Sequence, residues 1–248
     1  MTAVVFGGSK GIGREIALSI ASRQPGATIA INYAHDDEAA KDTATEIEKR
    51  GAVALLVKGD ISSAEGALDV ARRINSTCES VTEVIHASVT AFTAPALSVD
   101  LCKFNEALQL NGMSLLYVVQ ALRPMFRAGT SIVFLSSNGS KVAIRGYMPL
   151  GAPKALAECL VRYLAVELAK EQVRINIVTP SGLLTDAFRK IVSSVDEALE
   201  FQRKATPMGR NVTFDDVNDA VAYLTSPASS FMTAQELVLD GGLYTRAR

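Results

Sequence analysis

Ala3-Val4-Val5-Phe6-Gly7-Gly8-Ser9-Lys10-Gly11-Ile12-Gly13 is the stretch that decides the fold of this 248-residue chain. Its first four residues predict a short buried strand, and a helical pattern follows the glycines through Ala21. Glycines in such a turn let the backbone approach a pyrophosphate, whose negative charge is favoured at a helix N-terminus. A plain tight turn is the weaker interpretation, because this turn opens a repeating pattern of strands and helices.

That pattern continues along the whole chain and predicts an α/β fold. Apolar runs alternate with segments of helical periodicity, as is typical of a Rossmann-type, doubly wound parallel sheet. One domain spanning residues 1–248 is expected, in which about residues 185–212 form a variable lid over the site. The strands are expected at residues 3–6, 28–33, 53–57, 81–85, 131–135, 173–178 and 236–239, and the later helices at 38–50, 64–74, 101–126, 155–169 and 215–224.

Two of these helices contain residues that suit a helix poorly. Asn111-Gly112 lies inside the segment 101–126, and the low propensity of both residues predicts a local kink with a freed carbonyl. Pro153 has no N–H to donate, so the helix that follows is expected to begin near it.

Composition excludes several classes of protein. The 25 basic and 26 acidic residues give no electrostatic case for a nucleic-acid or membrane partner. No run reaches the roughly 18 apolar residues of a membrane span, and no signal core follows Met1. Cys78, Cys102 and Cys159 lack metal-ligand spacing and are expected to be reduced and buried thiols. A cytoplasmic, soluble protein is therefore expected.

A second stretch, Ser136-Ser137-Asn138-Gly139-Ser140, precedes Tyr147 and Lys154. It follows the strand expected at 131–135, so hydroxyls at a strand end face a helix start that carries a phenol and an amine. On one continuous helix, residues seven apart share a face at about 10 Å along the axis. A phenol with a pKa of about 10 becomes a useful donor when a cation such as Lys154 stabilises its anion. A loop tyrosine and a solvated lysine are the alternative interpretation.

The end of the strand at 28–33 discriminates between nicotinamide cofactors. An acid there would bind the adenosine ribose hydroxyls of NAD, but the sequence has Asn32-Tyr33-Ala34-His35. NADPH is therefore expected over NADH, with Lys10 able to meet the 2′-phosphate. Asp36 and Asp37 weaken this preference, although they also suit the start of the following helix, where acids are favoured by its dipole.

Two further strand ends carry polar residues. Gly59-Asp60-Ile61 follows the strand at 53–57, and Asp60 lies where an adenine amino group could be met; a helix-capping or turn role is the alternative. His86-Ala87-Ser88 follows the strand at 81–85. A lone histidine at a strand end is usually structural, so no catalytic role is expected for His86.

Together these residues resemble the short-chain dehydrogenase/reductase family over the whole chain. The resemblance implies a doubly wound parallel sheet and a homotetramer or homodimer. The matching features are the glycines at 7, 11 and 13, Asp60, Asn111, Ser137 seventeen residues before Lys154, Asn176, Pro180, Thr185 and Asp240-Gly241-Gly242.

One departure from the family is informative. Most members place the catalytic tyrosine four residues before the lysine, a position that is Leu150 here. Tyr147, seven residues before Lys154, instead resembles the NADPH-dependent enoyl-acyl-carrier-protein reductases of the family. Gly151 and the runs at 85–88 and 161–165 agree with that resemblance, whereas Phe6, Ser181 and the prolines at 149 and 153 are unusual.

The resemblance also implies the roles of the site residues. Tyr147 would stabilise an enolate oxygen, Lys154 would hold the nicotinamide ribose hydroxyls, and Thr185 would meet the carboxamide. Ser137 would assist the chemistry or shape the pocket, and Asn111 completes the catalytic set as a structural or relay residue; no metal is implied. The expected cofactor-binding residues are Gly7, Ser9, Lys10, Gly11, Ile12, Gly13, Tyr33, His35, Asp60, Ile61, His86, Ala87, Lys154, Pro180, Gly182 and Thr185.

Three functions follow as hypotheses. The first is reduction of the 2,3 double bond of an enoyl thioester by NADPH, the acyl group being carried by acyl carrier protein or coenzyme A, in fatty-acid or specialised biosynthesis. The second is reduction of a 3-oxoacyl thioester or another ketone. The third is a catalytically silent NADP-binding protein, since fold alone does not decide function.

Overall fold

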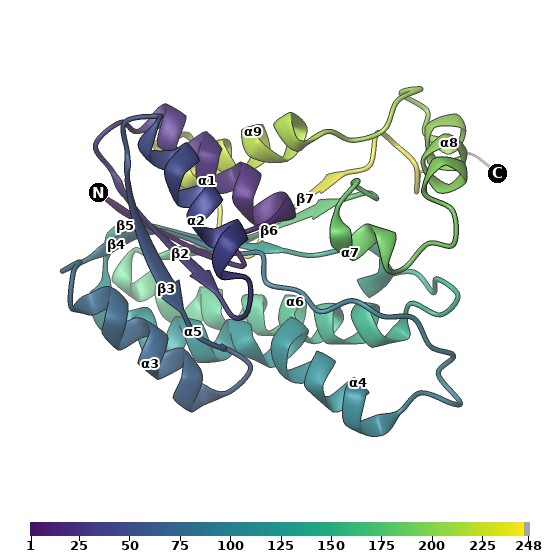
Figure 1. Ribbon diagram of the computed structural model, residues 1–248, viewed down its shortest axis with the longest axis horizontal. Coiled ribbons are helices and arrows are strands. Elements are labelled where there is room, and N and C mark those ends of the chain that lie inside the picture. Colours follow the sequence, from purple (N-terminus) through teal and green to yellow (C-terminus); the bar gives the residue numbers. More distant parts are fainter. Residues whose placement is uncertain (246–248) are drawn as a thin grey trace.

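Seven parallel strands form one twisted sheet in the computed structural model, which describes residues 1–245 (Figure 1). The strand order is β3-β2-β1-β4-β5-β6-β7, so the chain winds outward from β1 to β3 and then returns to lay β4 beside β1. This reversal confirms the predicted doubly wound α/β fold. The strands are β1 (Thr2–Phe6), β2 (Thr28–Tyr33), β3 (Val53–Lys58), β4 (Val81–His86), β5 (Phe126–Leu135), β6 (Arg174–Pro180) and β7 (Glu236–Leu239).

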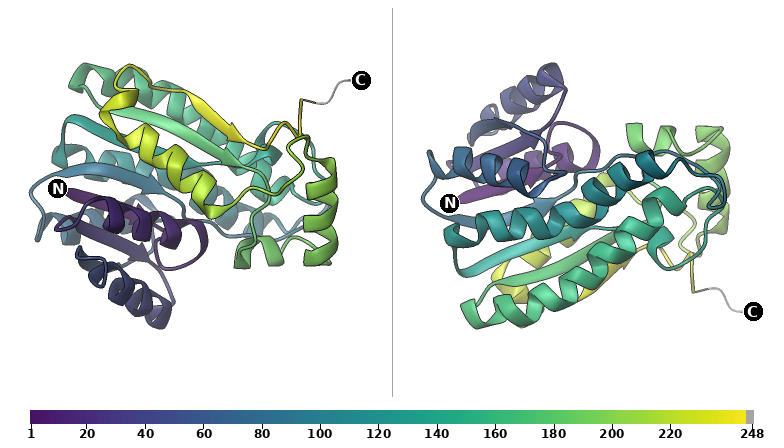
Figure 2. Two further views of the ribbon diagram at one scale, coloured as in Figure 1. Left: turned by 90° about the horizontal axis from the view of Figure 1, so that it is seen from above. Right: turned by 90° about the horizontal axis from the view of Figure 1, so that it is seen from below.

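Helices cover both faces of the sheet in two layers (Figures 1 and 2). Successive strand residues point to opposite faces, so Val5 packs with the first layer and Val4 with the second. The first layer contains α1 (Gly11–Arg23), α2 (Asp37–Glu48) and α9 (Phe214–Thr225). The second contains α3 (Ala64–Asn75), α4 (Leu101–Leu108), α5 (Ser114–Leu122) and α6 (Met148–Leu168).

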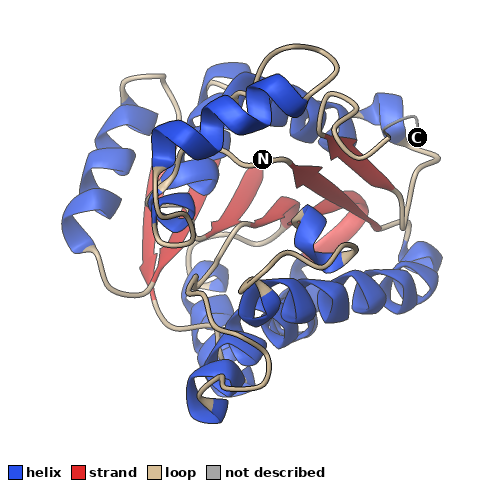
Figure 3. Ribbon diagram, turned by 90° about the vertical axis from the view of Figure 1, so that its right-hand side faces the viewer, coloured by secondary structure: helices blue, strands red, loops and turns tan. Residues whose placement is uncertain are grey.

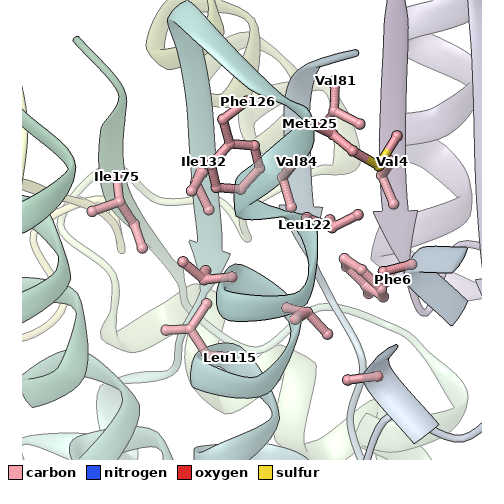
Figure 4. Packing of buried hydrophobic residues seen from close by; sticks show 14 of the residues in the cluster. Val4, Phe6, Val81, Val84, Leu115, Leu122, Met125, Phe126, Ile132 and Ile175 are labelled. Carbon is pink, nitrogen blue, oxygen red and sulfur yellow. The ribbon is translucent and has the colours of Figure 1, made fainter. Parts of the chain in front are cut away.

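The core of the second layer lies between the sheet, α3, α5 and α6 (Figure 4). Phe6 of β1 and Phe134 of β5 contribute large aromatic rings from either side of β4, and Leu115 and Leu122 cover them from α5; all four are almost completely buried. Each such side chain contributes roughly 1.5–3 kcal/mol through burial. The ends of β1, β4 and β5 are therefore held on a rigid apolar base.

Two short helices occupy the segment expected to be a lid. α7 (Asp186–Arg189) and α8 (Val195–Ala205) follow β6 and lie beyond the carboxyl edge of the sheet, at the right of Figure 1. Figure 3 looks toward this edge, where the loops that follow the strands gather between the two helical layers. This is the edge at which parallel sheets bind ligands.

The long helix expected at 101–126 is interrupted. α4 passes into the π-helical turn η1 (Gln109–Met113), α5 follows it, and the chain leaves through the 3₁₀ turn η2 (Arg123–Met125) into β5. The π turn contains Asn111-Gly112 and confirms the predicted irregularity. The expected end of the helix was wrong, because Pro124 in η2 stops the helix and Phe126 already pairs with Val81 of β4.

α6 begins at Met148, so the expectation of a start near Pro153 was also wrong. Pro149 occupies the first turn, where a missing N–H costs nothing, and Pro153 lies inside the helix at the cost of one hydrogen bond. The π turn packs tightly here: a Cβ on Gly112 would lie 2.9 Å from the Pro153 carbonyl oxygen. This close packing supports the helix where its own hydrogen bonding is weakest.

Two expectations from composition can be compared with the structure. Within residues 1–245, no helix has the length and apolar character needed to cross a bilayer. All three cysteines are free thiols; Cys78 is buried and Cys159 partly buried. The expected burial is wrong for Cys102, which is exposed on α4.

Candidate active site

The glycine turn between β1 and α1 forms a backbone cradle. Gly7 and Gly11 have φ angles of 73° and 54°, in the left-handed region that glycine adopts without strain. A Cβ on Gly13 would collide with the Gly7 carbonyl oxygen, and one on Gly7 would lie 2.7 Å from the backbone nitrogen of Ser88. Because side chains are excluded and α1 begins directly beyond, the turn fits a pyrophosphate group.

Ser9 and Ile12 complete this turn as predicted from the sequence. The carbonyl of Ser9 accepts a hydrogen bond from the Thr43 hydroxyl of α2 at 3.0 Å. Ile12 packs against the core of the first helical layer. These contacts tie the turn to α2 and to the core of the first helical layer.

Lys10, the residue expected to meet a 2′-phosphate, forms an ion pair with Asp36. Their hydrogen bond raises the pKa of Lys10 and lowers the pKa of Asp36. Asp36 is also the N-cap of α2 and accepts from the Ala39 N–H at 2.9 Å. The helix-starting alternative for Asp36 is therefore confirmed, and its charge offsets that of Lys10.

A second ion pair lies beside the first. The Asp37 carboxylate accepts from Lys58 Nζ at 2.6 Å and from the buried Tyr33 hydroxyl at 2.9 Å. The Lys58 hydrogen bond lowers the pKa of Asp37, and burial raises the pKa of Tyr33. His35 is exposed between these residues. The end of β2 therefore presents two acids that are each neutralised by a lysine.

Asp60 and Ile61 follow β3 and have different surroundings. The Asp60 carboxylate accepts from the Ser62 N–H and from the Ser62 hydroxyl, both at 2.9 Å. This is the turn role that was the alternative to an adenine contact. Ile61 is buried in the core of the second layer, so its side chain supports this turn from beneath.

His86 ends β4 as a completely buried side chain. Its Nε2 lies 2.7 Å from the Ser114 hydroxyl, and its ring lies between Phe6 and Phe134. Burial lowers the pKa of His86 to about 3, so the ring is neutral. The predicted cofactor contact through this side chain is therefore wrong, because the sheet edge hides the ring. Ala87 lies at the glycine turn, where its N–H donates to the Phe6 carbonyl at 2.9 Å.

The hydroxyls of Ser137 and Tyr147 meet beyond the end of β5. Ser137 is the N-cap of the 3₁₀ turn η3 (Asn138–Ser140), and Tyr147 is the N-cap of α6. The two hydroxyl oxygens are 2.8 Å apart. Burial raises the pKa of Tyr147, an effect opposed by Ser137 and reinforced by Tyr244. Lys154 does not contribute to this shift, so the predicted stabilisation of the phenolate by Lys154 is wrong: the phenol stays protonated and can donate a hydrogen bond. The hydroxyls of Ser137 and Tyr147 are called the hydroxyl pair below.

Two glycines make room for the ring of Tyr147. A Cβ on Gly139 would overlap the ring carbons of Tyr147, and a Cβ on Gly151 would collide with the Gly139 carbonyl. The ring is therefore seated on the backbone of η3. Gly151 entered the prediction through the family resemblance, whereas the part played by Gly139 was missed.

Lys154 is buried and is the seventh residue of α6 (Met148–Leu168). Its amine donates to the Leu135 carbonyl at 2.7 Å and lies 4.5 Å from the centroid of the Phe134 ring. Burial lowers the pKa of Lys154 to about 7, while the charge of Glu158 acts in the opposite direction. The amine therefore changes its protonation close to neutral pH, at the end of the strand that leads to Ser137.

Asn111 is completely buried in the π turn. Its side-chain amide donates to the Thr90 carbonyl and accepts from the Thr90 N–H, both at 2.9 Å. Because both ends of the amide hold the loop after β4, the side chain does not serve the hydroxyl pair. Its predicted place among the catalytic residues is corrected to the structural role that was the alternative.

The loop after β6 returns to the glycine turn. Pro180 is buried at the end of β6, and Thr185 caps α7 by accepting from the Phe188 N–H at 3.1 Å. A Cβ on Gly11 would lie 3.5 Å from Thr185 Cγ2, so residues far apart in sequence meet here. Thr185 thus stands beside the cradle, where the resemblance places the nicotinamide end of a cofactor.

Gln202 of α8 ties the lid to this loop, a contact that the sequence did not reveal. Its side-chain amide donates to the Gly182 carbonyl at 2.9 Å and accepts from the Gly182 N–H at 3.0 Å. A Cβ on Gly182 would lie only 2.7 Å from Gln202 Oε1. The glycine at this position is therefore explained by the side chain that rests on it.

Fold and site together define a dinucleotide-dependent oxidoreductase: a phosphate cradle and a half-buried tyrosine hydroxyl share one edge of a doubly wound sheet. Residues 7–244 match a family described as Enoyl-(Acyl carrier protein) reductase. The chain therefore belongs to the short-chain dehydrogenase/reductase family.

Known relatives are named for different redox reactions, both dehydrogenation and reduction. The chain is 32% identical to L-rhamnose 1-dehydrogenase (NAD(P)(+)) of Sphingomonas sp., covering 98% of this chain and 96% of the relative. It is 28% identical to 1-cyclohexenylcarbonyl-CoA reductase of Streptomyces collinus, covering 97% and 85%. The crystal structure of the enoyl-[acyl-carrier-protein] reductase (NADH) of Aquifex aeolicus superposes with a TM-score of 0.89 at 25% identity, covering 100% and 97%. These names support NAD(P)-linked redox chemistry and leave the substrate open.

Proposed function

We propose that this protein reduces the 2,3 double bond of an enoyl thioester, carried by coenzyme A or acyl carrier protein, with NADPH as the hydride donor. The observation that carries the proposal is the Tyr147 hydroxyl, 2.8 Å from Ser137 Oγ at the end of β5 and seven residues before the buried Lys154. The similarity to a cyclohexenylcarbonyl-CoA reductase and to an enoyl reductase structure supports it.

In this reaction NADPH supplies a hydride to the β-carbon of the acyl group. Negative charge then develops on the thioester oxygen as an enolate, and Tyr147 donates a hydrogen bond to that oxygen. A proton from solvent then adds to the α-carbon, so that one hydride and one proton saturate the double bond. Burial raises the pKa of Tyr147, which keeps the hydrogen available for donation. Ser137 holds the phenol from its other side, which limits the orientations that Tyr147 can adopt.

Lys154 contributes positive charge next to this centre and, as the resemblance implies, holds the nicotinamide ribose hydroxyls. Its position at the end of β5 supports the electrostatic part of this role, because the low dielectric of a buried site strengthens charge interactions. Lys10 is the residue proposed to meet the 2′-phosphate that distinguishes NADPH from NADH.

Reduction of a 3-oxoacyl thioester or another ketone is the second candidate. Two hydroxyls at 2.8 Å are also suited to hold a carbonyl oxygen while it gains a proton. The 32% identity to a sugar dehydrogenase favours this candidate. A silent NADP-binding protein, with the usual tyrosine position lost to Leu150, is the third.

The test follows NADPH oxidation by absorbance with crotonyl-coenzyme A and acetoacetyl-coenzyme A side by side, with NADH as the cofactor control. Oxidation with the crotonyl thioester alone is expected. Oxidation with the acetoacetyl thioester alone would establish the ketone reductase instead. Tight NADPH binding without oxidation on either thioester would favour the silent protein.

We also propose that the protein forms a homodimer or homotetramer. Tyr163 and Val166 on α6 are each 70% exposed, which is unusual for large apolar side chains on adjoining turns of one helix. Light scattering of the full chain measures the assembly directly, and a monomer at micromolar concentration would contradict this proposal.

A further inference from the structure

A buried carboxylate lies behind the site and has no part in the mechanism above. Glu158 follows Lys154 by one turn of α6, and only 7% of its surface is exposed. It accepts hydrogen bonds from the Ser136 hydroxyl, from the Ser140 hydroxyl at 2.6 Å and from Lys141 Nζ at 3.4 Å. Burying a carboxylate is costly unless such partners satisfy it.

All three partners come from one segment, residues 136–141, which joins β5 to the loop before α6. Ser136 and Ser140 lie on either side of Ser137 in this segment. Ser140 Oγ is also 2.7 Å from the Ser137 carbonyl. A single carboxylate on α6 therefore holds both ends of the turn that presents Ser137.

The other half of the hydroxyl pair is fixed by the same helix. Tyr147 is the N-cap of α6, and its carbonyl accepts from the Leu150 and Gly151 N–H groups at 3.0 Å and 2.9 Å. Glu158 thus links the helix that begins at Tyr147 to the turn that carries Ser137. The 2.8 Å separation of the two hydroxyls depends on the relative position of these two segments.

The negative charge of Glu158 also acts on the Lys154 amine. The groups that face the Lys154 amine from neighbouring elements are His86 of β4, which is neutral because burial lowers its pKa, and the Phe134 ring of β5. Lys141, which binds Glu158, also pairs with Glu236 of β7. Glu158 is the carboxylate whose charge raises the pKa of Lys154 against the effect of burial.

We propose that Glu158 is a positioning residue for the reaction: it holds segment 136–141 against α6 and thereby keeps Ser137 within hydrogen-bond distance of Tyr147. The expected change in kcat rests on the proposed function, whereas the expected change in the Ser137–Tyr147 distance does not. A displacement of about 1 Å at such a pair can cost up to about 100-fold in turnover.

The test compares Glu158→Ala, which removes the acceptor, with Glu158→Gln, which keeps an acceptor and removes the charge. Glu167→Gln is the matched control, because Glu167 is an exposed glutamate on the same helix. In a crystal structure of Glu158→Ala the Ser137–Tyr147 oxygen distance is expected to exceed 3.5 Å. On the thioester that the wild type reduces, kcat is expected to fall about tenfold while the KM for NADPH stays within about twofold.

Glu158→Gln separates position from charge. Its Ser137–Tyr147 distance and kcat at the optimum are expected to stay near those of the wild type. The alkaline limb of its pH profile is expected to move to lower pH, because Lys154 loses the charge that opposes desolvation. If Glu158 had only a structural role, the alkaline limb would not move in Glu158→Gln. It should also stay in place in the control variant Glu167→Gln.

An unchanged Ser137–Tyr147 distance in folded Glu158→Ala would overturn the proposal. If that variant does not fold, the double variant Ser136→Ala/Ser140→Ala removes two of the three contacts and must lengthen the same distance. Should the wild type reduce neither thioester, the proposed function fails, but the crystallographic distance still decides the role of Glu158.

Discussion

The glycine turn after β1 and the hydroxyl pair beyond β5 occupy the same edge of the sheet but are built differently. The turn is made of backbone within residues 7–13. Its shape requires that Gly7 and Gly13 have no Cβ atom, because a Cβ at either position would collide with neighbouring backbone. The hydroxyl pair is made of side chains from two segments, and its geometry depends on buried supports such as Glu158. The first kind of site is sensitive to any added atom, whereas the second is sensitive to the loss of a partner.

The largest effect that we expect comes from the buried Lys154 amine near the hydroxyl pair, which has no counterpart in the glycine turn. The folded-state pKa of Lys154 is about 7 against an ordinary value of 10.5, so the unfolded chain binds more protons between these values. Wild-type stability therefore rises with pH across this window. Lys154→Met is expected to raise the free energy of unfolding by about 5 kcal/mol at pH 6 and by only about 1.5 kcal/mol at pH 9.5, since one pKa unit corresponds to about 1.4 kcal/mol.

Urea unfolding at the two pH values measures this difference, with Lys170→Met as the control for an exposed lysine. An equal change at both pH values would mean that the Lys154 amine is not desolvated as described.

The glycine turn should respond to a single methyl group. In Gly13→Ala the new Cβ would collide with the Gly7 carbonyl, and backbone cannot yield as a flexible side chain does. We expect the Kd for NADPH, measured by fluorescence titration, to rise about 100-fold. Gly26→Ala is the control for a methyl group outside the turn: its Cβ meets nothing within 4 Å, and its φ of 83° limits the cost to backbone strain at that position. Equal Kd values in Gly13→Ala and the wild type would show that the turn does not bind the cofactor.

A methyl group added next to the hydroxyl pair would displace a side chain rather than the backbone. Gly139→Ala would push a Cβ into the ring of Tyr147 and should lower kcat about tenfold, with little effect on NADPH binding. In a Tyr147→Phe background the same change should cost almost nothing more, because the hydroxyl is already gone. Additive losses would mean that Gly139 affects the site by another route.

The smallest expected effect concerns cofactor preference at the end of β2. Asp36→Asn removes the charge that pairs with Lys10 but keeps an N-cap for α2, since asparagine caps helices well. The ratio of kcat/KM for NADPH to that for NADH should rise about threefold, as expected for one exposed pair. Asp37→Asn is the control, because the Asp37 carboxylate pairs with Lys58 rather than with Lys10. A ratio unchanged in Asp36→Asn would remove Lys10 from the phosphate contact.

The same contrast explains how far the sequence could be interpreted. The fold and the glycine turn follow from local patterns: strand, glycines and helix lie within a few residues of one another. The irregularity at Asn111-Gly112 was also predicted, because poor helix propensity is a local property. The start of α6 was not predicted, because Pro153 lies inside the helix, where it packs against a π turn that is distant in sequence.

The supports of the reaction site could not be found in this way. Glu158, Gln202 and Gly139 act through contacts that the tertiary fold creates, and each is ordinary in its local sequence. His86 shows the converse: its position at a strand end indicated a structural role, and the burial of its ring by Phe6 and Phe134 agrees with that local interpretation rather than with the cofactor contact implied by the resemblance.

The most direct test of the central claim is the turnover of Tyr147→Phe with crotonyl-coenzyme A and NADPH. Removing the donor to the enolate oxygen should lower kcat about 100-fold or more, while the Kd for NADPH stays within about twofold. Tyr223→Phe, which changes an exposed tyrosine on α9, should match the wild type. Near-full activity in Tyr147→Phe would contradict the account and remove Tyr147 from the mechanism.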